Sequence, residues 1–261
     1  MSELLYEKDG PIATLTLNRP ERMNTISGPM LAELSEKLLT ASADRDVRAI
    51  ILTGSGRAFC AGLDLQDATR GTGIGGGGSL GVTLDLRDAP PTVLHKLDKP
   101  VICALNGGAA GYGMDLALGC DIRIASSRAK LAAAFTRRGV LPESGGTWIL
   151  PRLVGWAKAA EIIFTGRTLD ADQCLALGLV NQVVPEASLM QAARDMANEI
   201  AANAPLAVQS AKRMMRIGLS EQFEDHVHHV FLQLLPLFQS HDFREGMSSF
   251  LEKRDPKFHG K

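Results

Sequence analysis

The sequence predicts an α/β fold that passes into a helical C-terminal region, and three observations support this. Short segments with strand character alternate with segments of helical periodicity in the first 150 residues or so. Two of the strand segments, around 49–52 and 101–105, are continuously apolar, which is typical of strands buried on both faces. From about residue 155 onward the pattern is almost wholly helical.

The N-terminal elements follow from a turn signal and from the spacing of apolar residues. Residues 4–8 and 12–17 are expected to be two strands, because Asp9-Gly10-Pro11 between them contains the strong turn signal Asp-Gly. Apolar residues between 30 and 39 recur at spacings of three and four, which indicates a helix. Residues 47–53 then form the first buried strand.

The next segments repeat the strand, turn and helix order. We expect a helix over 83–97, a buried strand over 101–105, a short helix over 114–119 and a strand over 122–125. The segment 71–81 is rich in glycine, but no Gly-Lys-Ser/Thr follows it and no buried strand precedes it, so it is not a Walker-type phosphate loop. A flexible loop that gates a substrate site is the remaining functional interpretation.

The predicted C-terminal helices account for most of the chain after residue 155. They span 156–164, 171–177, 187–202, 205–217, 220–238 and 242–253.

Composition limits the classes of function. Hydrophobic residues make up 45% of the 261 residues, enough for a sizeable core, and the net charge of −1 offers no basic excess for nucleic acid. No secretory signal and no apolar stretch long enough to span a membrane is present, so a cytoplasmic location is expected. The four cysteines have apolar or small neighbours and form no C-x-x-C pair, which predicts reduced core cysteines: Cys60, Cys103, Cys120 and Cys174.

Two turns rich in small residues, 58–65 and 106–113, each follow a buried strand. Small residues let a backbone approach a ligand closely. Free N–H groups at the start of the helix near Tyr112 carry partial positive charge, and two donors from separate turns could share one thioester oxygen. Glycine turns between strands and helices are common, however, so the residues alone leave a purely structural interpretation open.

The order and spacing of these turns resemble the paired oxyanion-hole segments of the crotonase (enoyl-CoA hydratase/isomerase) superfamily. Other segments resemble the same family in the same order and extend the resemblance over essentially the whole chain: Leu-Asn-Arg-Pro at 17–20, 120–125, Gly-Val-Leu-Pro-Glu-Ser-Gly-Gly-Thr at 139–147, 164–166, 176–181 and 250–258.

The resemblance implies a core of repeated ββα units over residues 1–198 and a helical trimerisation region over 199–261. It also implies an acyl-CoA thioester substrate, with coenzyme A as part of the substrate and no separate cofactor, and a homotrimer or a dimer of trimers. The oxyanion donors would be the N–H groups of Leu63 and Tyr112. Tyr112 departs from the glycine usual at this position, so its phenol either narrows the acyl pocket or packs against the core.

Further site residues are implied by position in the family pattern. Around the acyl group we expect Ala61, Asp64, Gly111 and Phe135. Local positive charge for the phosphates of coenzyme A would come from Arg19, Arg22 and Lys257.

The acid–base residues depart from the hydratase pattern. Family hydratases use two glutamates, of which one maps to Asp115 and the other to Phe135, which cannot titrate. Glu143 occupies a third acidic position, used by peroxisomal-type enoyl-CoA isomerases and by ring-epoxide isomerases of phenylacetate breakdown. We therefore favour a double-bond isomerase with Glu143 as proton shuttle. The alternatives are a hydratase that uses Asp115 with Glu143, and an acyl-CoA-binding member without catalysis.

Simpler roles exist for these residues. Asp115 in the first turn of its helix and Glu143 ahead of a helix near Gly145 could each stabilise a helix N-terminus. His226 and His229 could share a helix face, but no third ligand is evident, so no metal site is predicted. Ser144 lies in no Gly-x-Ser-x-Gly elbow, which argues against a hydrolase triad.

Overall fold

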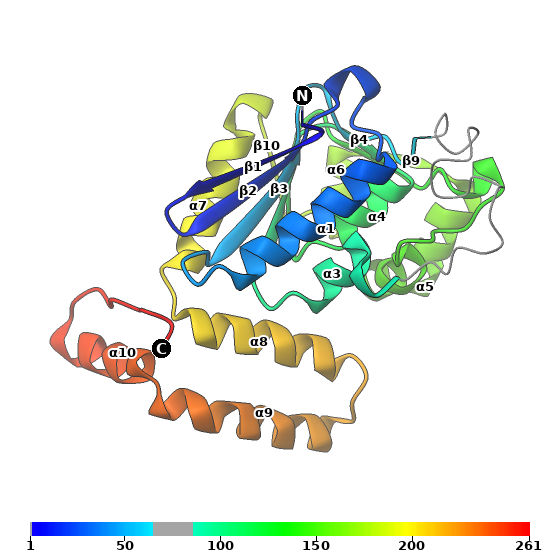
Figure 1. The fold of residues 1–261 in the computed structure, drawn as a ribbon. Helices are drawn as coiled ribbons and strands as arrows, with labels where there is room; N and C mark the ends of the chain where they lie inside the picture. The colour runs from blue at the N-terminus through cyan, green and yellow to red at the C-terminus, as the bar shows by residue number, and fades with distance from the viewer. Residues whose placement is uncertain (1, 65–85) are drawn as a thin grey trace.

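The computed structural model describes residues 2–64 and 86–261, and its body contains two sheets that contribute to one hydrophobic core (Figure 1). The larger sheet has six strands that follow one another in chain order: β1 (Leu4–Asp9), β2 (Ile12–Leu17), β3 (Ala49–Gly54), β5 (Val101–Leu105), β7 (Ile122–Ser126) and β10 (Gln182–Val184). β1 and β2 pair antiparallel, and each later pair is parallel. The α/β class predicted from the sequence is confirmed.

The smaller sheet consists of three-residue strands, again in chain order: β4 (Ala58–Cys60), β6 (Gly108–Ala110), β8 (Lys130–Ala132) and β9 (Thr168–Asp170). β4, β6 and β8 follow β3, β5 and β7, so the chain adds one long strand and then one short strand in turn. This is the repeated ββ arrangement that the family resemblance implies.

The continuous apolar runs of the long strands reflect burial on both faces. In β3, Ile50 and Leu52 belong to the core shared with the small sheet, whereas Ala49 and Ile51 face the other way. The second face is covered by α7 (Leu189–Ala201), through Leu189 and alanines of its buried stripe. On the first face lie α1 (Gly28–Ala43), α3 (Pro90–Lys96) and α4 (Tyr112–Leu118) (Figure 1).

Two expectations about helices were wrong in detail. The helix predicted over 83–97 is a 3-10 turn (Leu86–Asp88) followed by α3, which starts only at Pro90 because consecutive prolines suit a first helical turn. Residues 83–85, and the glycine-rich segment 71–81 with its proposed gating role, lie outside the described residues. α4 begins at Tyr112, earlier than predicted.

The expectation of an almost wholly helical chain after residue 155 is confirmed by a helix at each of the six predicted places, but it missed two short strands. β9 and β10 interrupt it, and each is paired with an earlier strand, β8 and β7. Three residues are too few to show an alternating pattern, so these strands owe their conformation to their neighbours. α5 (Gly146–Thr165) bends at Gly155, where φ is +75°, and α6 (Ala171–Ala176) follows β9.

The last three helices, α8 (Pro205–Gly218), α9 (Phe223–Gln239) and α10 (His241–Glu252), lie below the body in Figure 1. Asp98 joins α8 to the body, because its carboxylate pairs with Arg213 at 2.5 Å and with Arg216 at 3.0 Å. α7, whose buried side chains pack on the larger sheet, runs to Ala201, past the domain boundary expected at residue 198.

All four cysteines are buried and unpaired, as predicted. Within residues 2–64 and 86–261, no helix combines the length and the apolar character that crossing a bilayer requires.

Candidate functional site

The two turns predicted to form an oxyanion hole are in direct backbone contact. A Cβ added to Gly113, in the first turn of α4, would lie 2.1 Å from the carbonyl oxygen of Cys60 at the end of β4. Gly62 has a φ of +105°, and a Cβ there would lie 3.0 Å from the Ala110 oxygen and 3.9 Å from the Tyr112 nitrogen. Glycine is therefore required at both positions, and it brings the two turns within contact distance.

Each turn presents an N–H group that donates to no acceptor in the described part of the chain. Leu63 and Ile26 form a parallel β-bridge, and both hydrogen bonds of this bridge are made by Ile26. The N–H of Ile26 donates to the Gly62 oxygen at 2.9 Å, and its own oxygen accepts the N–H of Asp64 at 3.0 Å. The N–H of Leu63 therefore points away from Ile26. Tyr112 is the first residue of α4, so its N–H has no intrahelical acceptor. The two predicted donors thus lie on adjacent turns.

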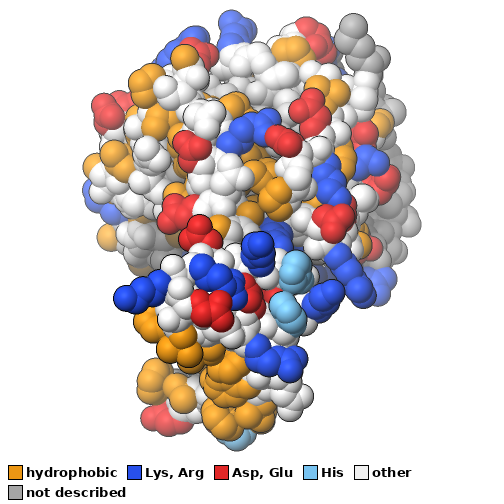
Figure 2. Space-filling model, turned by 90° about the vertical axis from the view of Figure 1, so that its left-hand side faces the viewer, with side chains coloured by type: hydrophobic (Ala, Val, Ile, Leu, Met, Phe, Trp, Pro, Cys, Tyr) orange, Lys and Arg blue, Asp and Glu red, His pale blue; other side chains and the backbone are white. Residues whose placement is uncertain are grey.

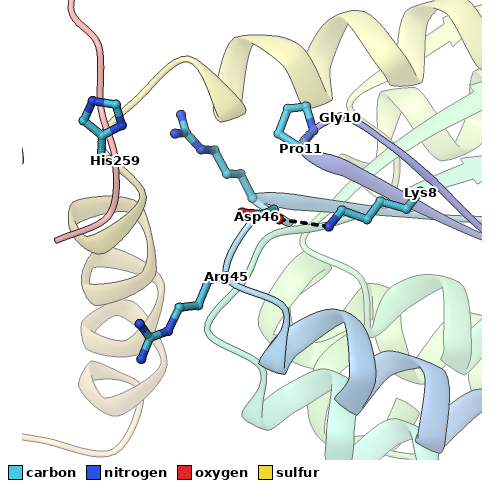
Figure 3. Close-up of a pocket in the computed structure, with 7 residues that line it drawn as sticks. Lys8, Gly10, Pro11, Arg45, Asp46 and His259 are labelled. Carbon is cyan, nitrogen blue, oxygen red and sulfur yellow. Dashed lines mark hydrogen bonds and ion pairs between the residues drawn. The ribbon is translucent and has the colours of Figure 1, made fainter.

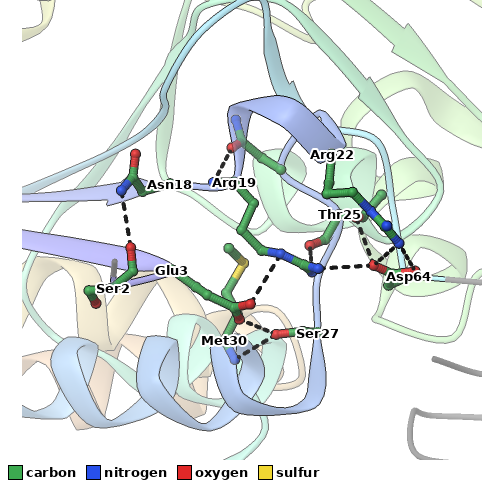
Figure 4. A network of polar contacts seen from close by, with 10 residues as sticks. Ser2, Glu3, Asn18, Arg19, Arg22, Thr25, Ser27, Met30 and Asp64 are labelled. Carbon is green, nitrogen blue, oxygen red and sulfur yellow. Dashed lines mark hydrogen bonds and ion pairs between the residues drawn. The ribbon is translucent and has the colours of Figure 1, made fainter. Parts of the chain in front are cut away.

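A buried carboxylate holds the first turn in place (Figure 4). Asp64 accepts hydrogen bonds from Arg19 at 3.2 Å, from Arg22 at 3.0 and 3.1 Å, and from the Thr25 hydroxyl at 3.3 Å. Arg19 also pairs with Glu3 at 3.2 Å. These pairs anchor the segment that carries Ala61 and Leu63. A role for Arg19 and Arg22 in binding phosphates of coenzyme A stays a prediction.

Two asparagines that the sequence analysis did not single out for the site support the same turn. The Nδ2 groups of Asn24 and Asn106 both donate to the Ala58 oxygen, at 2.8 and 3.1 Å. The Oδ1 of Asn106 accepts the N–H of Gly54 at 3.1 Å, which links the ends of β3 and β5. Nothing in the local sequence around Asn24 signals this, because the contacts reach across more than 30 residues.

Asp115 bonds to a helix other than its own. Its buried carboxylate accepts the N–H groups of Ser144 at 3.3 Å and Gly146 at 3.2 Å, and Gly146 is the first residue of α5. A Cβ on Gly146 would lie 2.2 Å from Asp115 Oδ1, so only glycine leaves room for the carboxylate. Asp115 lies in the first turn of α4, as predicted, but its hydrogen bonds are made at the start of α5.

The carboxyl groups of Asp115 and Glu143 are perturbed towards neutrality. Burial raises the pKa of Asp115 to about 7, the nearby charge of Glu143 adds to the increase, and the N–H groups of Gly146 and Ser144 oppose it. Partial desolvation raises the pKa of Glu143 above its ordinary value, although the side chain as a whole is exposed. A carboxyl group with a pKa near 7, as at Asp115, can both take and give protons at neutral pH.

Apolar side chains lie at the second turn and just ahead of Glu143 in the chain. Phe135 is buried at the second turn, where its Cε1 lies 3.8 Å from the position that a Cβ of Gly111 would occupy. The ring of Tyr112 belongs to the core cluster, in agreement with the packing interpretation of this residue. Val140 and Leu141, just ahead of Glu143, are 54% and 65% exposed, so the chain offers an apolar surface beside an acid.

The structure does not bring Lys257 to this site. Its backbone N–H donates to Glu245, and the C-terminal segment lies at the opposite end of the molecule from the turn that carries Arg19 and Arg22 (Figure 1). His226 and His229 both bond the carboxylate of Glu221, at 3.0 and 2.6 Å.

A cavity of about 690 Å³ lies away from this site (Figure 3). It opens between the β1–β2 turn, the segment between α1 and β3, and the C-terminal segment. Its lining is Lys8, Gly10, Pro11, Arg45, Asp46, Arg48 and His259. None of the predicted catalytic residues belongs to it.

The fold, the paired backbone donors and the adjoining carboxyl groups correspond to a class of α/β enzymes that move protons next to a carbonyl group. The enoyl-CoA hydratase/isomerase family matches residues 7–261, and the chain belongs to this family. The predicted membership in the crotonase superfamily, and the prediction of an enzyme, are confirmed.

The relatives include proteins named as isomerases and proteins named as hydratases. The chain is 40% identical over 268 residues to the 1,2-epoxyphenylacetyl-CoA isomerase of Escherichia coli (strain K12), with both proteins fully covered. It is 37% identical over 257 residues to the short-chain-enoyl-CoA hydratase of Clostridium acetobutylicum, covering 97% of this chain and 96% of that protein. The crystal structure of an enoyl-CoA hydratase from Bacillus anthracis has a TM-score of 0.91 at 33% identity, with both chains fully covered.

Proposed function

We propose that the protein is an acyl-CoA isomerase that converts a 3-enoyl-CoA to a 2-enoyl-CoA, with Glu143 as the proton shuttle. The observation that carries the proposal is the difference in burial and hydrogen bonding between the two carboxyl groups. Asp115 is buried and holds the start of α5 through Ser144 and Gly146, whereas Glu143 is exposed beside apolar side chains and has a raised pKa. The family resemblance assigns the second glutamate of hydratases to the position of Phe135, whose buried side chain cannot titrate.

The proposed steps follow from this arrangement. The Glu143 carboxylate takes a proton from C2 of the 3-enoyl thioester, and the electron pair passes to the thioester oxygen. The N–H groups of Leu63 and Tyr112 stabilise the resulting dienolate, as preorganised donors do. Glu143 then returns the proton to C4, which leaves the double bond between C2 and C3.

Hydration is the second candidate function. It is favoured by the pKa of about 7 at Asp115, next to a second carboxyl group, because water addition needs groups that accept and release protons. The name of the Clostridium acetobutylicum relative supports it equally. Substrates of both reactions are acyl-CoA thioesters, in line with the names of the relatives.

A product assay separates the two functions. Purified protein is given a 3-enoyl-CoA and, separately, a 2-enoyl-CoA, and the products are identified by mass and by retention. We expect conversion of the 3-enoyl form without gain of water, and loss of this activity by about 10²–10⁴-fold in Glu143→Gln. Glu186→Gln, an exposed glutamate paired with Arg128, is the matched control and should keep full activity. Isomerisation that survives in Glu143→Gln would rule out the shuttle.

We also propose that copies of this chain assemble through α8, α9 and α10 into a homotrimer or a dimer of trimers. α9 has no buried residue, and large apolar side chains on it are exposed to solvent. Phe223 and Phe231 are 75% and 53% exposed, and Phe250 on α10 is 80% exposed. Figure 2 shows hydrophobic side chains gathered on these helices. A contact between Lys257 and coenzyme A then requires a neighbouring copy. Light scattering should give three or six chains, and Phe250→Glu should lower that mass.

A further inference from the structure

Two hydroxyl groups beside Asp115 are buried without any use in the proposed isomerisation. Tyr112 and Ser144 are 4% and 5% exposed, and neither the phenol oxygen nor the serine oxygen has a hydrogen-bond partner in the described parts of the chain. A buried hydroxyl that makes no hydrogen bond costs free energy, because it has lost its water. Two such groups at one place point to a polar molecule that binds there.

Both residues flank the same carboxyl group. Tyr112 and Asp115 are three residues apart in α4, so their side chains lie on one face of the helix. Ser144 donates its N–H to Oδ2 of Asp115. Burial raises the pKa of the Tyr112 phenol above its ordinary value, and the nearby groups of Cys60, Glu143 and Asp115 add to the increase.

The chemistry of these groups selects their ligand. The two hydroxyls can donate hydrogen bonds, and the carboxylate of Asp115 can only accept them. A water molecule accepts two hydrogen bonds and donates two, and a buried water typically has two to four polar partners. A hydrocarbon acyl chain could satisfy none of these groups.

We propose that Tyr112, Ser144 and Asp115 hold one water molecule, which the enzyme adds to C3 of a 2-enoyl-CoA. The inference rests on the proposed function, since the same two N–H groups must stabilise the enolate. Tyr112 and Ser144 are positioning residues for the water. They supply hydrogen-bonding groups that the buried hydrocarbon ring of Phe135 cannot supply.

The step balances without any further reactant. The water oxygen forms a bond to C3 while its proton passes to the Asp115 carboxylate, and the π electrons of the C2–C3 bond move to the thioester oxygen. The enolate then takes a proton at C2 from the Glu143 carboxylic acid. Transfer of the proton held by Asp115 to Glu143 restores both groups, and one water has been added.

The test is the ratio of two rates measured on one preparation: formation of 3-hydroxyacyl-CoA from a 2-enoyl-CoA, and isomerisation of a 3-enoyl-CoA. Loss of folded protein lowers both rates together and leaves the ratio unchanged. Tyr112→Phe and Ser144→Ala should each lower the ratio of hydration to isomerisation about tenfold, because the water loses one of the two hydroxyl groups that form hydrogen bonds to it. The controls are Tyr6→Phe, the other tyrosine, and Ser35→Ala, another buried hydroxyl without a partner, and both should keep the wild-type ratio.

The outcomes separate this inference from the proposed function. Wild-type protein that isomerises but never hydrates overturns the inference and leaves the isomerase. Protein that hydrates but does not isomerise overturns the proposed function, and the hydration rate of Tyr112→Phe against Tyr6→Phe then tests the water site. An unchanged ratio in both Tyr112→Phe and Ser144→Ala refutes the site. A crystal structure at high resolution should show the water in wild type and lack it in Tyr112→Phe.

Discussion

Replacing Asp115 by Asn should make the protein more stable at neutral and alkaline pH. The amide has the size of the carboxyl group, and its oxygen can still accept the N–H groups of Ser144 and Gly146 at the start of α5. What it removes is a charge that burial disfavours. The variant therefore isolates the electrostatic cost of Asp115 from its role in holding α5.

The magnitude and the pH window follow from the pKa. Folding raises the pKa of Asp115 from 3.8 to about 7. At about 1.4 kcal/mol for each pH unit this corresponds to about 4 kcal/mol. Between these two values the folded protein holds a proton that the unfolded chain has lost, so the stability of the wild type falls as pH rises through the window. Above about pH 7 the full cost is present.

The measurement is urea unfolding of wild type and Asp115→Asn at several values between pH 5 and pH 8.5. The difference in free energy of unfolding should grow by about 2–3 kcal/mol over this range. Ser35→Ala, which replaces a buried hydroxyl that does not titrate in this range, should give a curve parallel to that of the wild type. Parallel curves for Asp115→Asn and wild type would show that the carboxyl group is not perturbed in the folded protein, and would refute the reasoning.

Three further substitutions test other contacts. Gly113→Ala puts a Cβ 2.1 Å from the Cys60 oxygen and should separate the two turns, which lowers kcat by about 10²–10³-fold at an unchanged oligomeric mass. Asp64→Asn leaves two guanidinium groups without their buried anion and should cost about 3 kcal/mol in urea unfolding. Arg254 and the Lys257 N–H hold the pKa of Glu245 at about 2, below its usual 4.5. The stability that wild type gains over Glu245→Gln is thus present above about pH 4.5, and the difference in Tm should shrink as pH falls towards 3.

The long strands could be predicted from the sequence because burial on both faces makes nearly every residue of such a strand apolar. Ile50 to Leu52 is apolar at every position, since α7 covers one face of the sheet, and the small sheet with α1, α3 and α4 covers the other. β9 has no such pattern. Of its three residues only Leu169 is buried, and its conformation depends on pairing with β8. A pattern that exists only through a neighbour cannot be recognised in the segment itself.

The same distinction applies to the site. The glycines of the two turns were visible because a close backbone approach demands a residue without a side chain, as Gly62 and Gly113 show. The bond from Asp115 to the start of α5 was not visible, because an aspartate in a first helical turn looks the same whichever helix it caps. The buried hydroxyl of Ser144 was equally hidden, since burial of a serine has no sequence signature.

The strand order has a consequence for how the protein emerges from the ribosome. Both sheets add their strands in the order of synthesis, so each new strand of the larger sheet pairs with the one made just before it. β1 remains one edge throughout, and the growing edge moves from β2 to β10. The nascent chain can therefore build its sheet one strand at a time, without waiting for a distant partner. Helices α8 to α10 appear last, when the body on which they rest is already complete.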